Sequence, residues 1–172
     1  MGGAGRAASY GLMVVGLSHL LSSLGSVAGG RLSDSLGRPL VMLAMTGASL
    51  TCSFTIGWLA GAPAALIFTI VMAYNLFAIA DSAVYSTALA EVVPAGRQGA
   101  AYSIRSVLGF GAGAISPWVF GMVLDLGRSG QVAQSTAWGL AWTSLAVGGL
   151  PGIAMILWFK KLAPRRLLRE NR

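Results

Sequence analysis

The stretch Gly30-Arg31-Leu32-Ser33-Asp34-Ser35-Leu36-Gly37-Arg38-Pro39 separates two long apolar segments of the chain. No Asp, Glu, Lys or Arg occurs from Ala7 to Gly30, and after this stretch none occurs until Asp81. A short charged stretch between apolar segments of this length is the pattern of a tight turn between two membrane helices. Asp34 lies four residues before Arg38, so we expect an acid and a base close together at the membrane edge.

The composition favours an integral membrane protein. The 172 residues are 55% apolar and only 10% charged, whereas ordinary soluble domains carry roughly 25% charged residues. Half of the basic residues lie in segment 160–172, which contains no aromatic residue. This segment is predicted to be a basic tail facing the anionic lipids of a bilayer, and a nucleic-acid partner is not expected. The one cysteine, Cys52, excludes a disulfide within one chain.

Five segments are long enough to cross a membrane as helices, which takes about 20 residues for roughly 30 Å of hydrocarbon. The predicted helices lie at about 9–29, 40–59, 64–89, 101–124 and 135–159. No segment alternates apolar and polar residues with period two, so strands are disfavoured. The predicted fold is therefore an all-α membrane domain over residues 1–159, followed by the tail at 160–172.

The distribution of basic residues predicts the orientation. Five helices put the two termini on opposite sides of the membrane. Ten basic residues then fall on the side of the C-terminus, and only Arg6 and Arg128 fall on the other. Because cytoplasmic loops carry the excess of Lys and Arg, the C-terminus is predicted to be cytoplasmic and the N-terminus external. A bacterial inner membrane is the expected location.

Asp81 is the first candidate for chemistry, because an acid inside a membrane helix is costly and usually faces a cavity or a partner. Helical spacing puts Tyr74 and Tyr85 on the same face, with Asn75 beside it. Two interpretations stay open. The polar stripe lines a cavity in which Asp81 exchanges a proton or contacts a solute, or Asp81 pairs structurally with a neighbouring helix.

His19, in the middle of the first predicted helix, is the second candidate. It either titrates near neutral pH or donates a hydrogen bond between helices. No second His exists, and no Cys or carboxylate lies at ligand spacing, so we expect neither a metal site nor another cofactor. Enzyme motifs such as GxSxG, HExxH and the phosphate-binding loop are absent from the sequence, so no catalytic site is predicted.

The fourth predicted helix is rich in glycine and contains a proline. Gly109 and Gly113 are four residues apart, a spacing that lets helix backbones approach closely. Pro117, followed by Gly121, removes a backbone donor and is expected to kink the helix. These residues either form a dense packing surface or make the helix a moving part.

Charged residues also flank the second polar connection. Glu91, Arg97 and Arg105 lie there, and together with Asp34 and Arg38 they are expected to form a charge cluster on the cytoplasmic face. The alternative is that they are solvated loop charges, whose pairs contribute only about 0–1 kcal/mol.

The opening stretch resembles the signature loop of the major facilitator superfamily, G-x-L-a-D-r-x-G-r-[rk]. The matching positions are Gly30, Leu32, Asp34, Gly37 and Arg38. Ser35 and Pro39 depart from it, because the family usually has bases there. The run from Pro94 to Asp125 is similar to the family's antiporter-type helix, with a Ser in place of the Gly before the proline.

The resemblance implies a transporter of two six-helix halves, with the solute site between them. The family loop follows the second helix of a half, so this chain is expected to be helices 8–12, rather than 2–6, without the first helix of its half. The first, third and fourth predicted helices would line the cavity. Asp34, Arg38 and Glu91 would form a cytoplasmic latch that opens and closes during alternating access.

The expected function is transport of a small solute by rocking against the missing half, coupled to a proton or driven by the solute gradient. One alternative is a non-transporting membrane protein that docks a separate partner half. Another is an intramembrane enzyme that uses Asp81 and His19.

Overall fold

A computed structural model describes the backbone of residues 3–127, 129 and 132–162, and side chains from residue 11 onward. The helices are α1 (Gly3–Leu36), α2 (Arg38–Ile56), α3 (Ala64–Val92), α4 (Gln98–Leu126) and α5 (Gln134–Leu162), with a short 3-10 helix η1 (Ala95–Arg97) before α4. The described residues form no strand. Most of the basic tail lies outside the described residues, and Lys160 and Lys161 belong to the last turn of α5.

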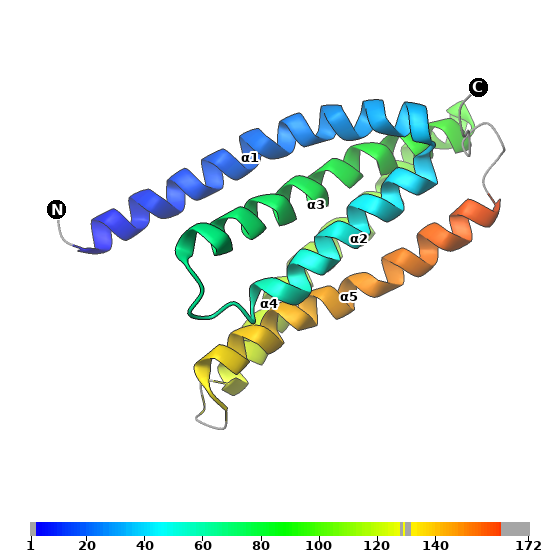
Figure 1. The fold of residues 1–172 in the computed structure, drawn as a ribbon. Coiled ribbons are helices and arrows are strands. Elements are labelled where there is room, and N and C mark those ends of the chain that lie inside the picture. Colours follow the sequence, from blue (N-terminus) through cyan, green and yellow to red (C-terminus); the bar gives the residue numbers. More distant parts are fainter. Residues whose placement is uncertain (1–2, 128, 130–131, 163–172) are drawn as a thin grey trace.

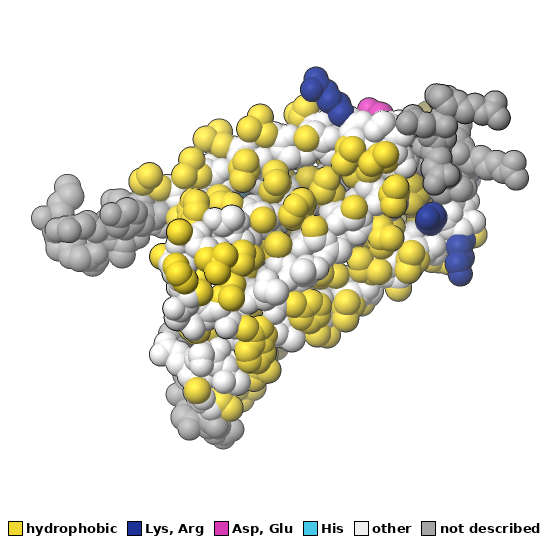
Figure 2. All heavy atoms as spheres, in the orientation of Figure 1, with side chains coloured by type: hydrophobic (Ala, Val, Ile, Leu, Met, Phe, Trp, Pro, Cys, Tyr) yellow, Lys and Arg dark blue, Asp and Glu magenta, His cyan; other side chains and the backbone are white. Residues whose placement is uncertain are grey.

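All five α-helices of the described chain are long and apolar enough to cross a membrane. The predicted all-helical fold with five spans is therefore confirmed at this level. Hydrophobic side chains spread over the visible face of the bundle, and the visible charged side chains lie towards the end where α1 and α5 finish (Figure 2). This end also holds Asp34, Arg38 and Glu91, and we call it the charged end.

The connection between α1 and α2 is shorter than the sequence suggests. The predicted turn covers the ten residues from Gly30 to Pro39, but only Gly37 lies outside both helices. Gly37 has φ = 90°, a region that favours glycine. Its N–H donates to the carbonyl of Ser33 (3.1 Å), and Pro39 stands in the first turn of α2, where a missing N–H costs nothing.

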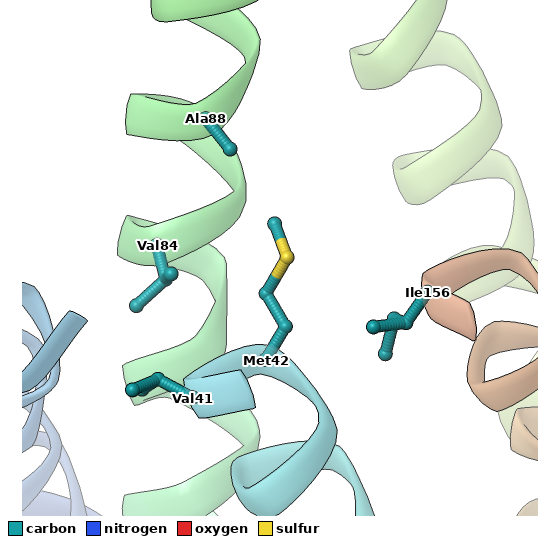
Figure 3. Close-up of a cluster of buried hydrophobic side chains, with 5 residues drawn as sticks. All are labelled: Val41, Met42, Val84, Ala88 and Ile156. Carbon is teal, nitrogen blue, oxygen red and sulfur yellow. The ribbon is translucent and has the colours of Figure 1, made fainter. Parts of the chain in front are cut away.

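Helices α1, α3, α2 and α5 lie in this order across the bundle, with α4 drawn behind α2 and packed mainly on α5, so helices adjacent in sequence are not always neighbours (Figure 1). Buried apolar side chains at the charged end join the middle three helices. Val41 and Met42 of α2 meet Val84 and Ala88 of α3 and Ile156 of α5 (Figure 3).

Glycines allow close packing at two helix interfaces, between α1 and α3 and between α2 and α5. A Cβ added at Gly29 of α1 would lie 3.3 Å from the backbone oxygen of Ala80 in α3. One added at Gly57, just after α2, would lie 2.9 Å from the Cα of Gly139 in α5. The helix backbones approach closely at these points because no side chain separates them.

Helix α4 is attached differently. Its described residues include none that is buried. It packs mainly on α5, where the Phe120 ring meets Trp138 and Trp142 edge-on, with centroids 6.0 and 5.7 Å apart. Added Cβ atoms at Gly109, Gly113 and Gly121 would meet nothing within 4 Å, so these glycines do not serve packing between the described helices.

The proline in α4 is accommodated by its neighbour. Pro117 has no N–H to donate to the carbonyl of Gly113, four residues earlier. The hydroxyl of Ser116 donates to that carbonyl instead, at 3.4 Å. A serine beside a proline satisfies the freed backbone group in an environment without water.

Candidate functional site

Arg38 joins three helices at the charged end. Its Nη2 lies 2.6 Å from Oδ1 of Asp34 at the end of α1 and 2.9 Å from Oε1 of Glu91 at the end of α3. Its Nε donates to Oε2 of Glu91 at 3.3 Å. Together with the Nη2–Oε1 bond this makes a bidentate pair between the guanidinium and the carboxylate. The side chain of Arg38 is only 11% exposed.

The end of α1 supplies further acceptors to the same guanidinium. Its Nη1 donates to the hydroxyl of Ser33 and, at 3.5 Å, to the carbonyl of Gly30. The sharp turn at Gly37 brings Arg38 back against the last turns of α1, so acceptors from α1 and α3 meet one side chain. The motif residues Gly30, Asp34, Gly37 and Arg38 therefore act as one structural unit.

The larger charge cluster predicted for this end does not form as a whole. Among the described residues, Arg97 of η1 makes no ion pair with any carboxylate. Arg105 lies two turns inside α4 and donates to Ser82 of α3.

Asp81 faces α2. The hydroxyl of Thr46 donates to Oδ2 of Asp81 at 3.2 Å and lies 3.4 Å from the hydroxyl of Tyr85. The structure thus contains the interhelical pairing that was one of the two interpretations of Asp81. Thr46 was not singled out from the sequence, although a hydroxyl on a helix adjacent to a membrane acid is a signal worth seeking.

The rest of the polar stripe divides between neighbours. The Tyr74 ring meets Trp142 of α5 edge-on, with centroids 5.6 Å apart. The amide of Asn75 donates to the carbonyl of Val71 at 2.9 Å, within α3. The backbone carbonyl of Asn75 accepts from Ser22 of α1 at 3.2 Å. Tyr74 and Asp81 therefore lie towards α5 and α2, whereas Asn75 lies where α1 packs.

His19 is exposed on α1. Within the described part of the chain, its imidazole shares no hydrogen bond or ion pair with Asp81. The structure therefore does not bring the two candidates for titration together. Searched over the described residues, the chain has no group of three His, Cys, Asp or Glu side chains placed to hold a metal ion.

No protein-family model, curated protein or solved structure matches this chain. The likeness of residues 30–38 to the transporter motif therefore remains a hypothesis, whose structural counterpart is the Asp34–Arg38–Glu91 cluster.

Proposed function

We propose that this chain forms part of a secondary transporter of the major facilitator type, in a bacterial inner membrane, with its C-terminus cytoplasmic. It moves a small solute by alternating access, together with a second helical half that supplies the facing wall of the solute cavity. The observation that carries the proposal is the Asp34–Arg38–Glu91 cluster, built on the residues that match the family motif.

The geometry of the cluster supports a role as a latch. It ties the ends of α1, α2 and α3 through one side chain, and each hydrogen bond to a charged group contributes about 1.5–3 kcal/mol. A difference of 1.4 kcal/mol shifts a two-state equilibrium tenfold, so making or breaking these bonds is sufficient to bias one state over another.

The attachment of α4 supports movement in the same bundle. Its hydrogen bonds to α3 lie near the charged end and include those from Tyr102 to the carbonyl of Ser86 (2.8 Å) and from Gln98 to that of Ala90 (3.2 Å). Side-chain bonds to backbone carbonyls break and re-form at lower cost than a packed core. The exposed glycines of α4 and the exposed His19 of α1 are then available to the solute path or to the second half.

Asp81 is the proposed coupling group. As a carboxylate it accepts from Thr46, and as a protonated acid it becomes a donor, so proton uptake changes the bond between α2 and α3. Tyr85, which contacts the same threonine, is the natural third member of that network.

The test is solute uptake into proteoliposomes that contain the chain with its partner half, screened over solute classes with and without a proton gradient. Asp34→Asn is expected to lower turnover several-fold with little change in the apparent affinity for the solute. A loss of affinity at unchanged turnover would mean that the cluster is no latch, and a correctly inserted assembly that moves no solute would contradict the proposal itself.

A further inference from the structure

Arg105 is a cation within a membrane-spanning helix, and among the described residues it forms no ion pair. It lies seven residues after Gln98, about 10 Å along α4. Its Nη2 donates to the backbone oxygen of Ser82 (3.1 Å) and to the Ser82 hydroxyl (3.0 Å). No Asp or Glu oxygen in the described chain lies within 4.0 Å of its guanidinium. Ionisable groups at such positions are rare and usually meet a counter-charge or line a functional cavity.

The guanidinium keeps unused donors. It carries five N–H groups in a planar fork, and the hydrogen bonds of Arg105 within the described structure use Nη2 alone. Ser106, the next residue, lines the same cavity, and its hydroxyl has no hydrogen-bond partner among the described residues. Both groups are therefore available to a ligand.

These donors line one open cavity of about 300 Å³, which is formed by Ser82, Arg105, Ser106, Gly109 and Phe110. Gly109 contributes no side chain, and a Cβ there would meet nothing within 4 Å, so the space beside the guanidinium stays open. Phe110 provides an apolar wall. The volume is at the lower end of the range for small-molecule sites.

We infer that Arg105 binds the anionic group of the transported solute, and that the solute is a small organic anion such as a carboxylate. The planar fork matches two carboxylate oxygens. The hydroxyls of Ser82 and Ser106 complete the polar side of the site, and Phe110 contacts the apolar remainder of the solute. This inference rests on the proposed transport function.

A structural alternative is that Arg105 only balances the charge of Asp81, the residue before Ser82. Arg105 does interact electrostatically with Asp81. The direct contacts favour a ligand, because the Asp81 carboxylate accepts from Thr46 on α2 and the guanidinium donates to the Ser82 oxygens, which leaves its other donors unused. In that alternative, replacement of Arg105 would change the stability of the bundle and leave anion binding unaffected.

The test uses the full 172-residue chain in lipid nanodiscs with benzoate and benzamide, which share a shape and differ in charge. Saturation-transfer NMR titration is expected to detect benzoate binding and at least tenfold weaker benzamide binding. Arg105→Gln should weaken benzoate binding about tenfold or more. Arg105→Lys, which keeps the charge and loses the fork, should weaken it less. The matched control is Arg97→Gln, which removes an arginine of η1 near the start of the same helix and should leave binding unchanged.

Equal binding of benzoate and benzamide, or benzoate binding that is unchanged by Arg105→Gln, would overturn the inference. Circular dichroism checks that each variant folds, and if Arg105→Gln does not, Arg105→Lys and Ser106→Ala decide by the same titration. Transport of only neutral or cationic solutes by the assembled protein would refute the anion site and leave the transport proposal intact. Benzoate binding through Arg105 without transport of any solute would support the anion site and contradict the transport proposal.

Discussion

Gly57 and Gly113 occupy contrasting parts of the bundle. Gly57 lies at the α2–α5 interface, where an added Cβ would lie 2.9 Å from backbone atoms of Trp138 and Gly139. Gly113 lies on α4, where an added Cβ would meet nothing within 4 Å. Gly57 has no room for a side chain because the α5 backbone lies against it. Gly113 has room for one, since none of the described residues lies close to it.

The contrast separates two meanings of glycine spacing in membrane helices. Glycines four residues apart indicate close approach of helices, and that expectation fits Gly25 and Gly29 against α3. On α4 the same spacing leaves an open surface, which suits a helix that moves or meets another protein half.

The largest effect is expected at the α2–α5 interface. Gly57→Ala should lower the free energy of unfolding by about 3 kcal/mol, the upper end for overpacking, because the new methyl group meets backbone that has no rotamer to change. SDS-induced unfolding in bicelles measures this. Gly113→Ala is the matched control and should not destabilise the bundle. Equal losses in the two variants would show that α4 packs as tightly as α2.

The next effect concerns the charged end. Arg38→Gln removes the charge that binds Asp34 and Glu91, and we expect a loss of about 2 kcal/mol in unfolding free energy. The same unfolding assay measures it. Arg97→Gln, at a residue without an ion pair in the described structure, should cost less than about 0.5 kcal/mol. If Arg38→Gln and Arg97→Gln lower the free energy of unfolding equally, the cluster is only a solvated group of charges.

A smaller effect on stability, with a large effect on uptake, is expected at Asp81. Asn keeps an oxygen that accepts from Thr46, so Asp81→Asn should change the unfolding free energy by less than about 1 kcal/mol. It removes the proposed proton site, so uptake by the proposed transporter, assembled with its second half, should no longer depend on a proton gradient. Uptake that keeps its dependence on pH in this variant would assign Asp81 to structure alone.

The smallest effect is expected where α4 meets α3. Tyr102→Phe removes one hydrogen bond, from the hydroxyl to the carbonyl of Ser86, and should cost about 0.6 kcal/mol, the average for such bonds in a membrane bundle. Ser53→Ala, which removes a bond of the same kind from α2 to Trp142 of α5, is the comparison. A loss above about 2 kcal/mol for Tyr102→Phe would mean that α4 is fixed in place.

The five helices were predictable because each needs only a long apolar run, which is a property of local sequence. The residues at which the helices begin and end were less predictable. Helix α1 continues to Leu36, past the predicted end at 29, because charged and small residues remain helical until Gly37. The side-by-side arrangement of α1 with α3 and of α2 with α5 has no counterpart in sequence order, since it depends on which faces pack.

The candidate site was predictable where residues close in sequence meet, as Asp34 and Arg38 do across one turn. Glu91 was expected near Arg38 as part of a larger charge cluster at the membrane edge, and the family resemblance singled out Asp34, Arg38 and Glu91 from that cluster. The contacts of Thr46 with Asp81 and of Ser82 with Arg105 were not predicted, because each joins helices whose relative rotation is set by side-chain packing.

Gly37 also sets how α1 and α2 transmit force. With one residue between Leu36 and Arg38, the two helix ends can separate by no more than about 7 Å between Cα atoms, the reach of two peptide units. The connection from α2 to α3, residues 57–63, has several times that slack. A displacement of α1 along its axis must therefore pull the start of α2 with it, and the bonds between Arg38 and Glu91 would pass that displacement on to the end of α3.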